Sequence, residues 1–186
     1  MTNAFYFDVG SPYVYPTVER LALDDVEWKP ISLGGLWKQS GGGSWALTDR
    51  RAEGIAEIEA RAERYGLPPI RWPVPWPGRY LSAMRACLVA AEDGVGEDFA
   101  RTALRMGFAE GRDLSEMSTV WEAGVRAGLD PLALNDRIGS PEIKQRLIDE
   151  TEAAYARGVR GVPTLDTGDE LLWGDDRMVL GEGGGS

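Results

Sequence analysis

Alternating apolar and polar positions predict a strand, a helix and a second strand at the start of the chain. Ala4 to Val9 is short and rich in aromatic residues, which is typical of a buried strand. Ser11 and Pro12 follow, and these residue types are favoured at the start of a helix, which we expect to run to about Leu23. Val26 to Leu33 predicts the second strand. Because a helix connects the two strands, they are expected to pair in parallel.

A long helical block occupies the middle of the chain. It follows a glycine-rich stretch at residues 38–44, which predicts a flexible loop, and it is interrupted at 66–78 by a loop rich in proline and tryptophan. Apolar residues that recur about every 3.6 positions predict its helices, which span residues 49–65, 80–92, 97–109, 114–127, 131–138 and 141–157. Two short strands, at 164–166 and 170–173, close the pattern.

This order of elements is that of an α/β, thioredoxin-like fold with an inserted all-helical domain. We assign residues 1–48 and 158–180 to the thioredoxin-like domain, 49–157 to the inserted helical domain and 181–186 to a flexible tail. A chain of 186 residues with 43% hydrophobic residues is large enough to bury a substantial core.

Charge and hydropathy narrow the range of partners. The net charge of −10 argues against nucleic acid and anionic membrane surfaces, because both are bound through clustered Lys and Arg. The chain shows neither a long apolar run nor a basic leader followed by apolar residues. We therefore expect no membrane partner and a cytoplasmic location.

Histidine is absent from the chain, and Cys87 is its only cysteine. The composition therefore excludes an intrachain disulfide, a Cys-x-x-Cys redox pair and any mechanism that needs a Ser-His or Cys-His pair. Most zinc sites are excluded as well, and we expect no metal. Cys87 lies in a predicted helix between Ala86 and Leu88, and we interpret it as a buried small hydrophobic residue.

Three segments carry polar groups that could do chemistry, and each has a second interpretation. Ser11 lies where backbone N–H groups stabilise an anion such as a cofactor thiolate, but it could also merely cap the helix. A cis peptide before Pro163 would leave the backbone of Val162 free to pair with a peptide-like ligand, whereas a trans peptide would be ordinary. Asp175 and Asp176 lie at a predicted helix start, where aspartate is also a common cap.

Five segments resemble one family, in the same order and at similar distances: the kappa-class glutathione transferases and the bacterial 2-hydroxychromene-2-carboxylate isomerases. The resemblance extends from about residue 4 to about residue 178. The five segments are Phe5–Tyr13, Leu33–Gly41, Glu110–Leu114, Ala156–Thr164 and Leu172–Met178.

The resemblance implies that the chain binds glutathione. Ser11 would be the catalytic residue that activates the cofactor sulfur, and Pro12 and Tyr13 would line the thiol site. Val162, in front of a cis Pro163, would hold the backbone of the cofactor.

At the γ-glutamyl end of the cofactor this chain departs from the family pattern. The resemblance implies that Asp176 pairs with the ammonium group of that end. Asp175, however, stands where relatives have Asn or Ser, and its carboxylate would repel the γ-glutamyl carboxylate unless it were protonated or turned away. Gly42 stands where many relatives have an Asn that touches the cofactor. Two adjacent aspartates suit a neutral sugar thiol better than a zwitterion, so mycothiol is the alternative cofactor.

By the same resemblance, the reaction is an isomerisation or transfer that acts on a small aromatic or conjugated carbonyl compound. In the isomerases of this family the thiol is regenerated rather than consumed. The residues expected to contact the substrate are Lys38, Trp76, Arg79 and Arg85, with the arginines near a carboxylate. The family is typically dimeric, so we expect a homodimer.

Two other functions stay open. A thiol–disulfide oxidoreductase of a related family would need cysteines where Ser11 and Val14 stand. A non-catalytic binding protein on the same fold would account for the departures at Gly42 and Asp175.

Overall fold

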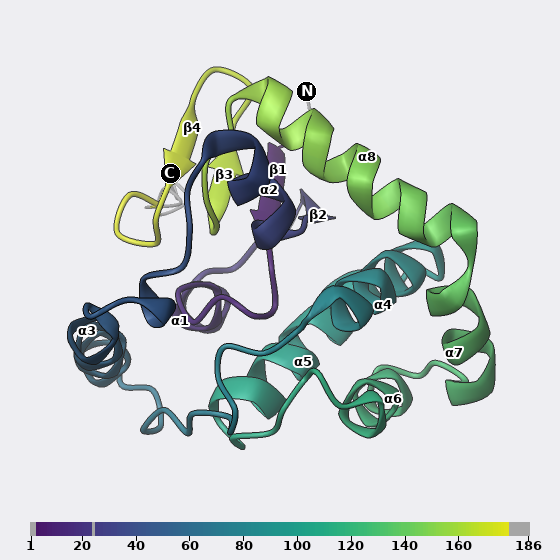
Figure 1. Ribbon diagram of the computed structural model, residues 1–186, viewed down its shortest axis with the longest axis horizontal. Coiled ribbons are helices and arrows are strands. Elements are labelled where there is room, and N and C mark those ends of the chain that lie inside the picture. Colours follow the sequence, from purple (N-terminus) through teal and green to yellow (C-terminus); the bar gives the residue numbers. More distant parts are fainter. Residues whose placement is uncertain (1–2, 24, 179–186) are drawn as a thin grey trace, which may run out of the picture.

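The sheet is small and mixed. The computed structural model describes residues 3–23 and 25–178, and four strands form one sheet in the order β2-β1-β3-β4 (Figure 1). β1 and β2 are parallel, whereas β3 is antiparallel to both of its neighbours, β1 and β4. In chain order the strands span Asn3–Phe7, Val26–Pro30, Thr164–Asp166 and Leu171–Trp173. The predicted parallel pair and the closing pair of short strands are confirmed.

The helical block separates β2 from β3 in the chain. All six of its predicted helices are confirmed to within a few residues, and α4 and α8 pack against β2. The helices of the described residues are α1 Val14–Arg20, α2 Leu33–Ser40, the 3-10 helix η1 Trp45–Leu47, α3 Arg51–Arg64, α4 Leu81–Glu92, α5 Gly96–Phe108, α6 Met117–Arg126, α7 Pro131–Gly139 and α8 Pro141–Arg157.

Helix α2 corrects the prediction of a long second strand followed by a glycine-rich loop. The side chain of Ser32 accepts a hydrogen bond from the Gly35 amide at 3.1 Å, and the carboxylate of Asp8 accepts one from the Leu33 amide at 2.8 Å. These bonds satisfy amides that a helix start leaves without partners. Gly41, with φ of 72°, then ends the helix in the left-handed region.

One hydrophobic core runs through the molecule. Phe5 and Phe7 of β1 are at most 1% exposed and belong to the same cluster of buried residues as Phe99 and Leu104 of α5. The core is therefore continuous across the predicted boundary at residue 49, while the domain limits themselves stay a prediction. The predicted tail at 181–186 lies outside the described residues.

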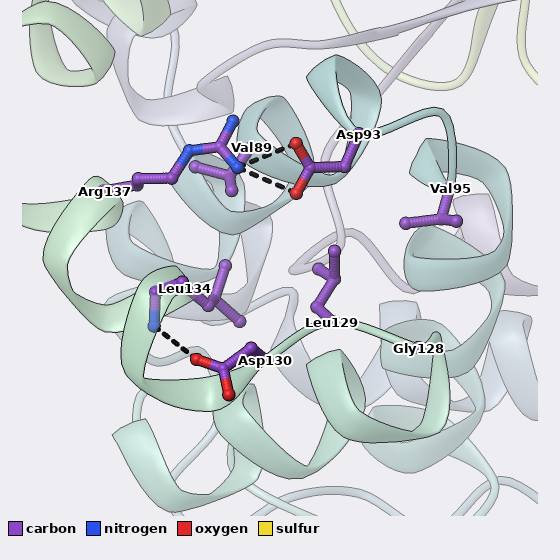
Figure 2. Close-up of a pocket in the computed structure, with 9 residues that line it drawn as sticks. Val89, Asp93, Val95, Gly128, Leu129, Asp130, Leu134 and Arg137 are labelled. Carbon is purple, nitrogen blue, oxygen red and sulfur yellow. Dashed lines mark hydrogen bonds and ion pairs between the residues drawn. The ribbon is translucent and has the colours of Figure 1, made fainter.

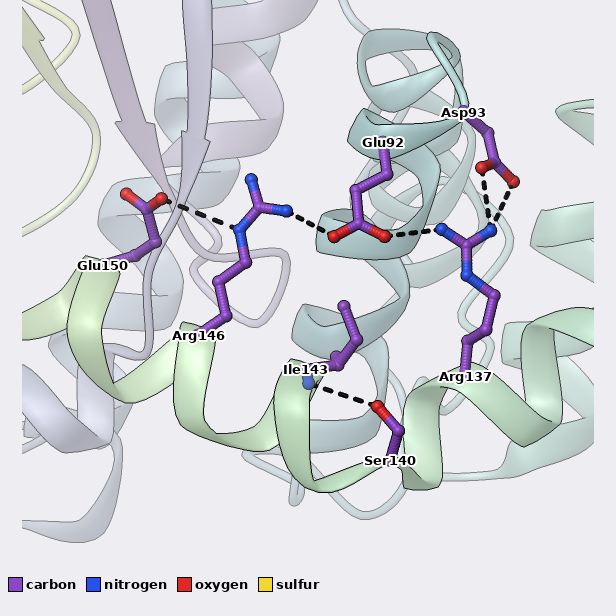
Figure 3. A network of polar contacts seen from close by, with 7 residues as sticks. All are labelled: Glu92, Asp93, Arg137, Ser140, Ile143, Arg146 and Glu150. Carbon is purple, nitrogen blue, oxygen red and sulfur yellow. Dashed lines mark hydrogen bonds and ion pairs between the residues drawn. The ribbon is translucent and has the colours of Figure 1, made fainter.

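A chain of ion pairs joins the helical block to the sheet. Glu92 at the end of α4 contacts Arg137 of α7 at 2.6 Å and Arg146 of α8 at 2.5 Å (Figure 3). Arg146 reaches Glu150 at 3.9 Å, and Glu150 reaches Lys29 of β2 at 3.8 Å. These groups are partly exposed, so each pair contributes at most about 1 kcal/mol, and their combined effect is to orient α7 and α8.

Residues 3–23 and 25–178 lack two features. No helix there combines the length and the apolar character needed to cross a membrane. The same residues contain no group of three or more acidic or cysteine side chains placed to hold a metal ion.

Candidate functional site

Four segments of the chain meet at one edge of the sheet. Tyr6 of β1 pairs with Thr164 of β3, and Thr164 pairs with Trp173 of β4. The end of β1, the start of β3 and the end of β4 therefore lie together, and the parallel partner β2 ends there as well, with Phe7 opposite Pro30. The segments that contain Ser11, Val162 and Asp175 all leave the sheet at this edge.

Ser11 is buried, yet its hydroxyl makes no hydrogen bond to any described residue. The side chain is 3% exposed, while its amide donates to the Asp8 carbonyl and its carbonyl accepts from Val14 at 3.1 Å. Helix α1 begins at Val14, with Tyr13 at the capping position and no side-chain cap. The prediction that the helix starts at Pro12 was therefore wrong, and the interpretation of Ser11 as a helix cap is excluded. The Ser11 hydroxyl is therefore not engaged by a hydrogen bond to another described residue.

Asp8 holds the turn in front of Ser11 in place. Its carboxylate accepts hydrogen bonds from the amides of Gly10 and Leu33, each at 2.8 Å. Burial raises the pKa of Asp8 to about 6, although both backbone N–H groups favour the ionised form. Asp8 was not among the predicted site residues. The sequence does offer a signal for it, because a single carboxylate directly follows the aromatic residues of the first strand.

Tyr80 packs directly on the backbone of Gly10. A Cβ atom added to Gly10 would lie 2.1 Å from Cδ2 of Tyr80, so only glycine allows this approach. The Tyr80 hydroxyl accepts a hydrogen bond from Gly78 at 2.8 Å, which fixes the ring. Tyr80 thus closes one side of the Ser11 turn, and the sequence did not reveal this contact.

Gly10→Ala is expected to destabilise the protein by about 1–3 kcal/mol, because the new methyl group overlaps the Tyr80 ring. Denaturant unfolding measures the effect. Gly43→Ala is the matched control, since nothing lies within 4 Å of its added Cβ. Equal stability of the two variants would contradict the close approach of Tyr80.

The peptide between Val162 and Pro163 is cis. The Pro163 carbonyl accepts a hydrogen bond from Gly174 at 3.0 Å, which ties the turn after β4 to this segment. Within the described part of the chain, neither the amide nor the carbonyl of Val162 has a hydrogen-bond partner. A backbone pair of this kind can bind a peptide-like ligand as an added strand would.

Asp175 faces the protein interior. It is 0% exposed, its carboxylate contacts the Arg61 guanidinium, and it accepts a hydrogen bond from the Tyr65 hydroxyl at 2.7 Å. Arg20 donates to its backbone carbonyl. The neighbouring Asp176 is exposed. Residues 175–177 form a turn, and any continuation beyond residue 178 lies outside the described residues.

Aromatic side chains connect Tyr13 with the predicted substrate residue Trp76. The Tyr13 ring lies 6.3 Å from Trp45, and Trp45 lies 5.5 Å from Trp76. The Trp72 ring lies 4.5 Å from that of Trp76 at an interplanar angle of 54°, and the Arg51 guanidinium lies 5.1 Å from the Trp76 ring. Trp76 is 6% exposed and its buried Nε1 has no partner among the described residues. Trp45, which mediates the connection, was not predicted.

The remaining predicted residues are not joined to Ser11. Lys38, Gly42 and Arg79 are exposed, and Lys38 lies in the last turn of α2. Arg85 is half-buried, with a buried Nε that has no partner in the described residues. Because no hydrogen bond or ion pair between described residues connects any of them to Ser11, their roles stay predictions. Cys87 is buried as predicted, and burial raises the pKa of its thiol.

A cavity of about 210 Å³ lies elsewhere, among α4, α5, α6 and α7 (Figure 2). Its polar groups are already engaged: Arg137 binds both oxygens of Asp93 at 2.8 Å, and Asp130 accepts a hydrogen bond from the Ala133 amide. The rest of its lining is largely aliphatic. We therefore place the candidate site at the sheet edge around Ser11.

The mixed sheet, the inserted helices and the polar edge define a thioredoxin-like fold. The chain belongs to the DSBA-like thioredoxin domain family, which it matches over residues 4–181. The predicted fold class and family resemblance are thereby confirmed.

Relatives with known names match almost the whole chain. It is 25% identical over 190 residues to the 2-hydroxychromene-2-carboxylate isomerase of Sphingobium xenophagum, covering 95% of this chain and 94% of the relative. It is 27% identical over 199 residues to glutathione S-transferase kappa 1 of Homo sapiens, covering 96% and 88%. A solved structure of a 2-hydroxychromene-2-carboxylate isomerase matches with a TM-score of 0.84 at 25% identity, covering 95% and 90%. These relatives are enzymes, an isomerase and a transferase.

Proposed function

We propose that the chain is a glutathione-dependent isomerase or transferase that acts on a small aromatic or conjugated carbonyl compound. The observation that carries the proposal is the Ser11 hydroxyl, which belongs to a buried residue at the sheet edge and makes no hydrogen bond to another described residue. The hydroxyl is therefore able to donate a hydrogen bond to a bound thiolate, and a hydrogen bond to an ionised group is stronger than one between neutral groups. The names of the two relatives support glutathione and this type of substrate.

The residues at the sheet edge suit a peptide-like thiol. Ser11 donates a hydrogen bond to the cofactor sulfur, which stabilises the thiolate and lowers the pKa of the bound thiol. Val162 pairs its backbone with that of the cofactor, beside Pro12, Tyr13 and Pro163. When bound, the thiol supplies a nucleophile that adds to a conjugated carbonyl substrate and later leaves it.

The contacts of Asp175 favour glutathione over mycothiol. The repulsion expected at the γ-glutamyl carboxylate is relieved, because Asp175 turns inward to Arg61 and Tyr65. Asp176 then remains as the exposed carboxylate of the turn and pairs with the ammonium group of the γ-glutamyl end. Mycothiol is kept as the second thiol to be tested.

The substrate lies against the aromatic side chains that continue from Tyr13 through Trp45 to Trp76. Flat apolar rings favour a planar substrate, and Lys38, Arg79 or Arg85 is proposed to bind its carboxylate. A disulfide oxidoreductase is disfavoured, since the only thiol in the chain is buried and its pKa is raised.

Isothermal titration with glutathione, and then with mycothiol, tests the proposal. We expect glutathione to bind wild type with a thiol pKa below that of the free cofactor, measured by thiolate absorbance. Ser11→Ala removes a hydrogen bond to a charged group and should weaken binding of the thiolate by about tenfold or more. Ser118→Ala, at an exposed position in α6, is the control and should bind as wild type does.

Three outcomes distinguish the functions. One outcome is that wild type binds the thiol and lowers its pKa, while Ser11→Ala returns that pKa toward the value of the free thiol. This outcome supports the thiol-dependent enzyme. Binding that is indifferent to Ser11→Ala contradicts the role of Ser11. No binding of either thiol contradicts the enzyme and favours a binding protein on the same fold.

A further inference from the structure

Two ends of the thiol site lie far apart in the chain but contact the same side chain. Tyr13 follows Ser11 and Pro12 near the start, and Asp175 belongs to the turn after β4 near the end. Arg61 of α3 reaches both: one nitrogen of its guanidinium contacts the Asp175 carboxylate, and the group lies 5.4 Å from the Tyr13 ring centroid. Arg61 thus lies between the sulfur end and the γ-glutamyl end of the proposed site.

Tyr13 is held by α3 at two points. Arg61 lies over the ring, and the Tyr13 hydroxyl donates to Glu57 at 3.2 Å. Glu57 in turn accepts a hydrogen bond from Arg61 at 2.7 Å, so Tyr13, Glu57 and Arg61 each contact the other two. Burial and the charge of Glu57 raise the pKa of Tyr13 to about 12, so the phenol keeps the proton that it donates.

The turn after β4 is held by the same helix. Tyr65 donates to the Asp175 carboxylate at 2.7 Å, beside Arg61. Arg20 at the end of α1 donates to the Asp175 carbonyl, and its guanidinium lies 4.9 Å from the Tyr65 ring centroid. Asp175 is 0% exposed, so the turn cannot move without breaking these bonds.

The sequence of α3 explains how one helix serves both ends. Glu57, Arg61 and Tyr65 are four residues apart and therefore lie on one face. Gly54, Ile58 and Ala62 form the adjacent buried face, which packs toward η1, with Trp45 close to Gly54. The apolar face fixes the helix, and the polar face next to it reaches the two segments.

We propose that Arg61 is a positioning residue that couples the Tyr13 end of the thiol site to the Asp175 turn. The proposal rests on the proposed function, because it assigns to Arg61 the geometry of that thiol site. Arg61 acts through Tyr13 on the loop of Ser11, and through Asp175 on the neighbouring Asp176. Its loss loosens both ends at once and weakens thiol binding without removing a group that touches the thiol.

Hydrogen exchange and thiol titration of Arg61→Met test the coupling. We expect faster amide exchange in both segments, residues 10–14 and 174–178, and a dissociation constant for glutathione at least tenfold higher than that of wild type. Arg64→Met, an exposed arginine one turn along the same helix, is the matched control and should change neither. Arg61→Met/Asp175→Asn removes both charges and serves as the folded variant if the single substitution unfolds the protein.

The outcomes separate this proposal from the proposed function. Faster exchange in only one segment, or unchanged glutathione affinity despite faster exchange in both, overturns the positioning role of Arg61. Faster exchange in both segments together with no thiol binding by wild type overturns the thiol-dependent enzyme but leaves the coupling intact. Faster exchange in both together with weaker binding supports both.

Discussion

Replacing Asp175 by alanine is expected to lower the free energy of unfolding by about 3–5 kcal/mol, because a buried ion pair that loses one partner leaves the other charge uncompensated. Asp175 is 0% exposed and contacts Arg61, whose side chain is 15% exposed. After the substitution, Arg61 keeps only its bond to Glu57, and the Tyr65 hydroxyl loses its acceptor. Urea unfolding near neutral pH measures the loss.

Two further substitutions control this result. Asp176→Ala changes the adjacent exposed carboxylate and should alter stability by no more than about 0.5 kcal/mol. Asp175→Asn keeps an oxygen that can accept from Tyr65, so its effect should lie between those of the two alanine variants. A loss below about 1 kcal/mol in Asp175→Ala would mean that water reaches the carboxylate in the folded protein, against its burial.

The stability of wild type relative to Asp8→Asn is expected to fall by about 2.4 kcal/mol between pH 4 and pH 7. The ordinary pKa of an aspartate is 3.8, and burial raises that of Asp8 to about 6. The folded state therefore binds the Asp8 proton more tightly than the unfolded state. The contribution of Asp8 is fully present below pH 3.8 and is lost as the pH rises through about 6, so stability decreases over this interval.

The neighbours of Asp8 do not interfere in this interval. Cys87 and Tyr80 are the titratable groups coupled to it, and burial raises the pKa of both, that of Tyr80 to about 12, so each stays neutral. Urea unfolding from pH 4 to pH 7 gives the profiles. Asp169→Asn, an exposed aspartate near the β3–β4 turn, is the control and should track wild type. Parallel profiles for wild type and Asp8→Asn would show that Asp8 keeps an ordinary pKa.

The sequence predicted correctly those helices whose ends are set by capping residues only a few positions away in the chain. Helix α8 begins at Pro141 after Ser140, whose side chain accepts from the Ile143 amide at 3.2 Å. Helix α2 was missed because part of its start comes from Asp8, a residue of another segment. The glycines at its beginning resemble the end of a strand when only neighbouring residues are considered.

The candidate site was predicted only in part, because contacts between segments that are distant in the chain also decide the state of its residues. Ser11 and Val162 were identified from motifs, but their alternatives could be weighed only with the hydrogen bonds of the folded chain. Asp175 was assigned to the cofactor because the sequence does not show its inward contacts. These contacts, with Arg61 and Tyr65, join residues more than a hundred positions apart.

The sequence by itself determined the four strands, the helices of the central block, the fold class and, through five similar segments, the family, and it excluded chemistry that needs histidine or a cysteine pair. The elements and the excluded chemistry depend on periodicity, composition and local spacing, and the family depends on the resemblance of segments, all of which can be read from the chain without its fold. Only the tertiary structure decided which polar groups are hydrogen-bonded within the protein and which have no partner among the described residues. A hydrogen bond depends on distances between segments that the fold brings together, so the engaged Asp175 and the unpartnered hydroxyl of Ser11 became distinguishable only there.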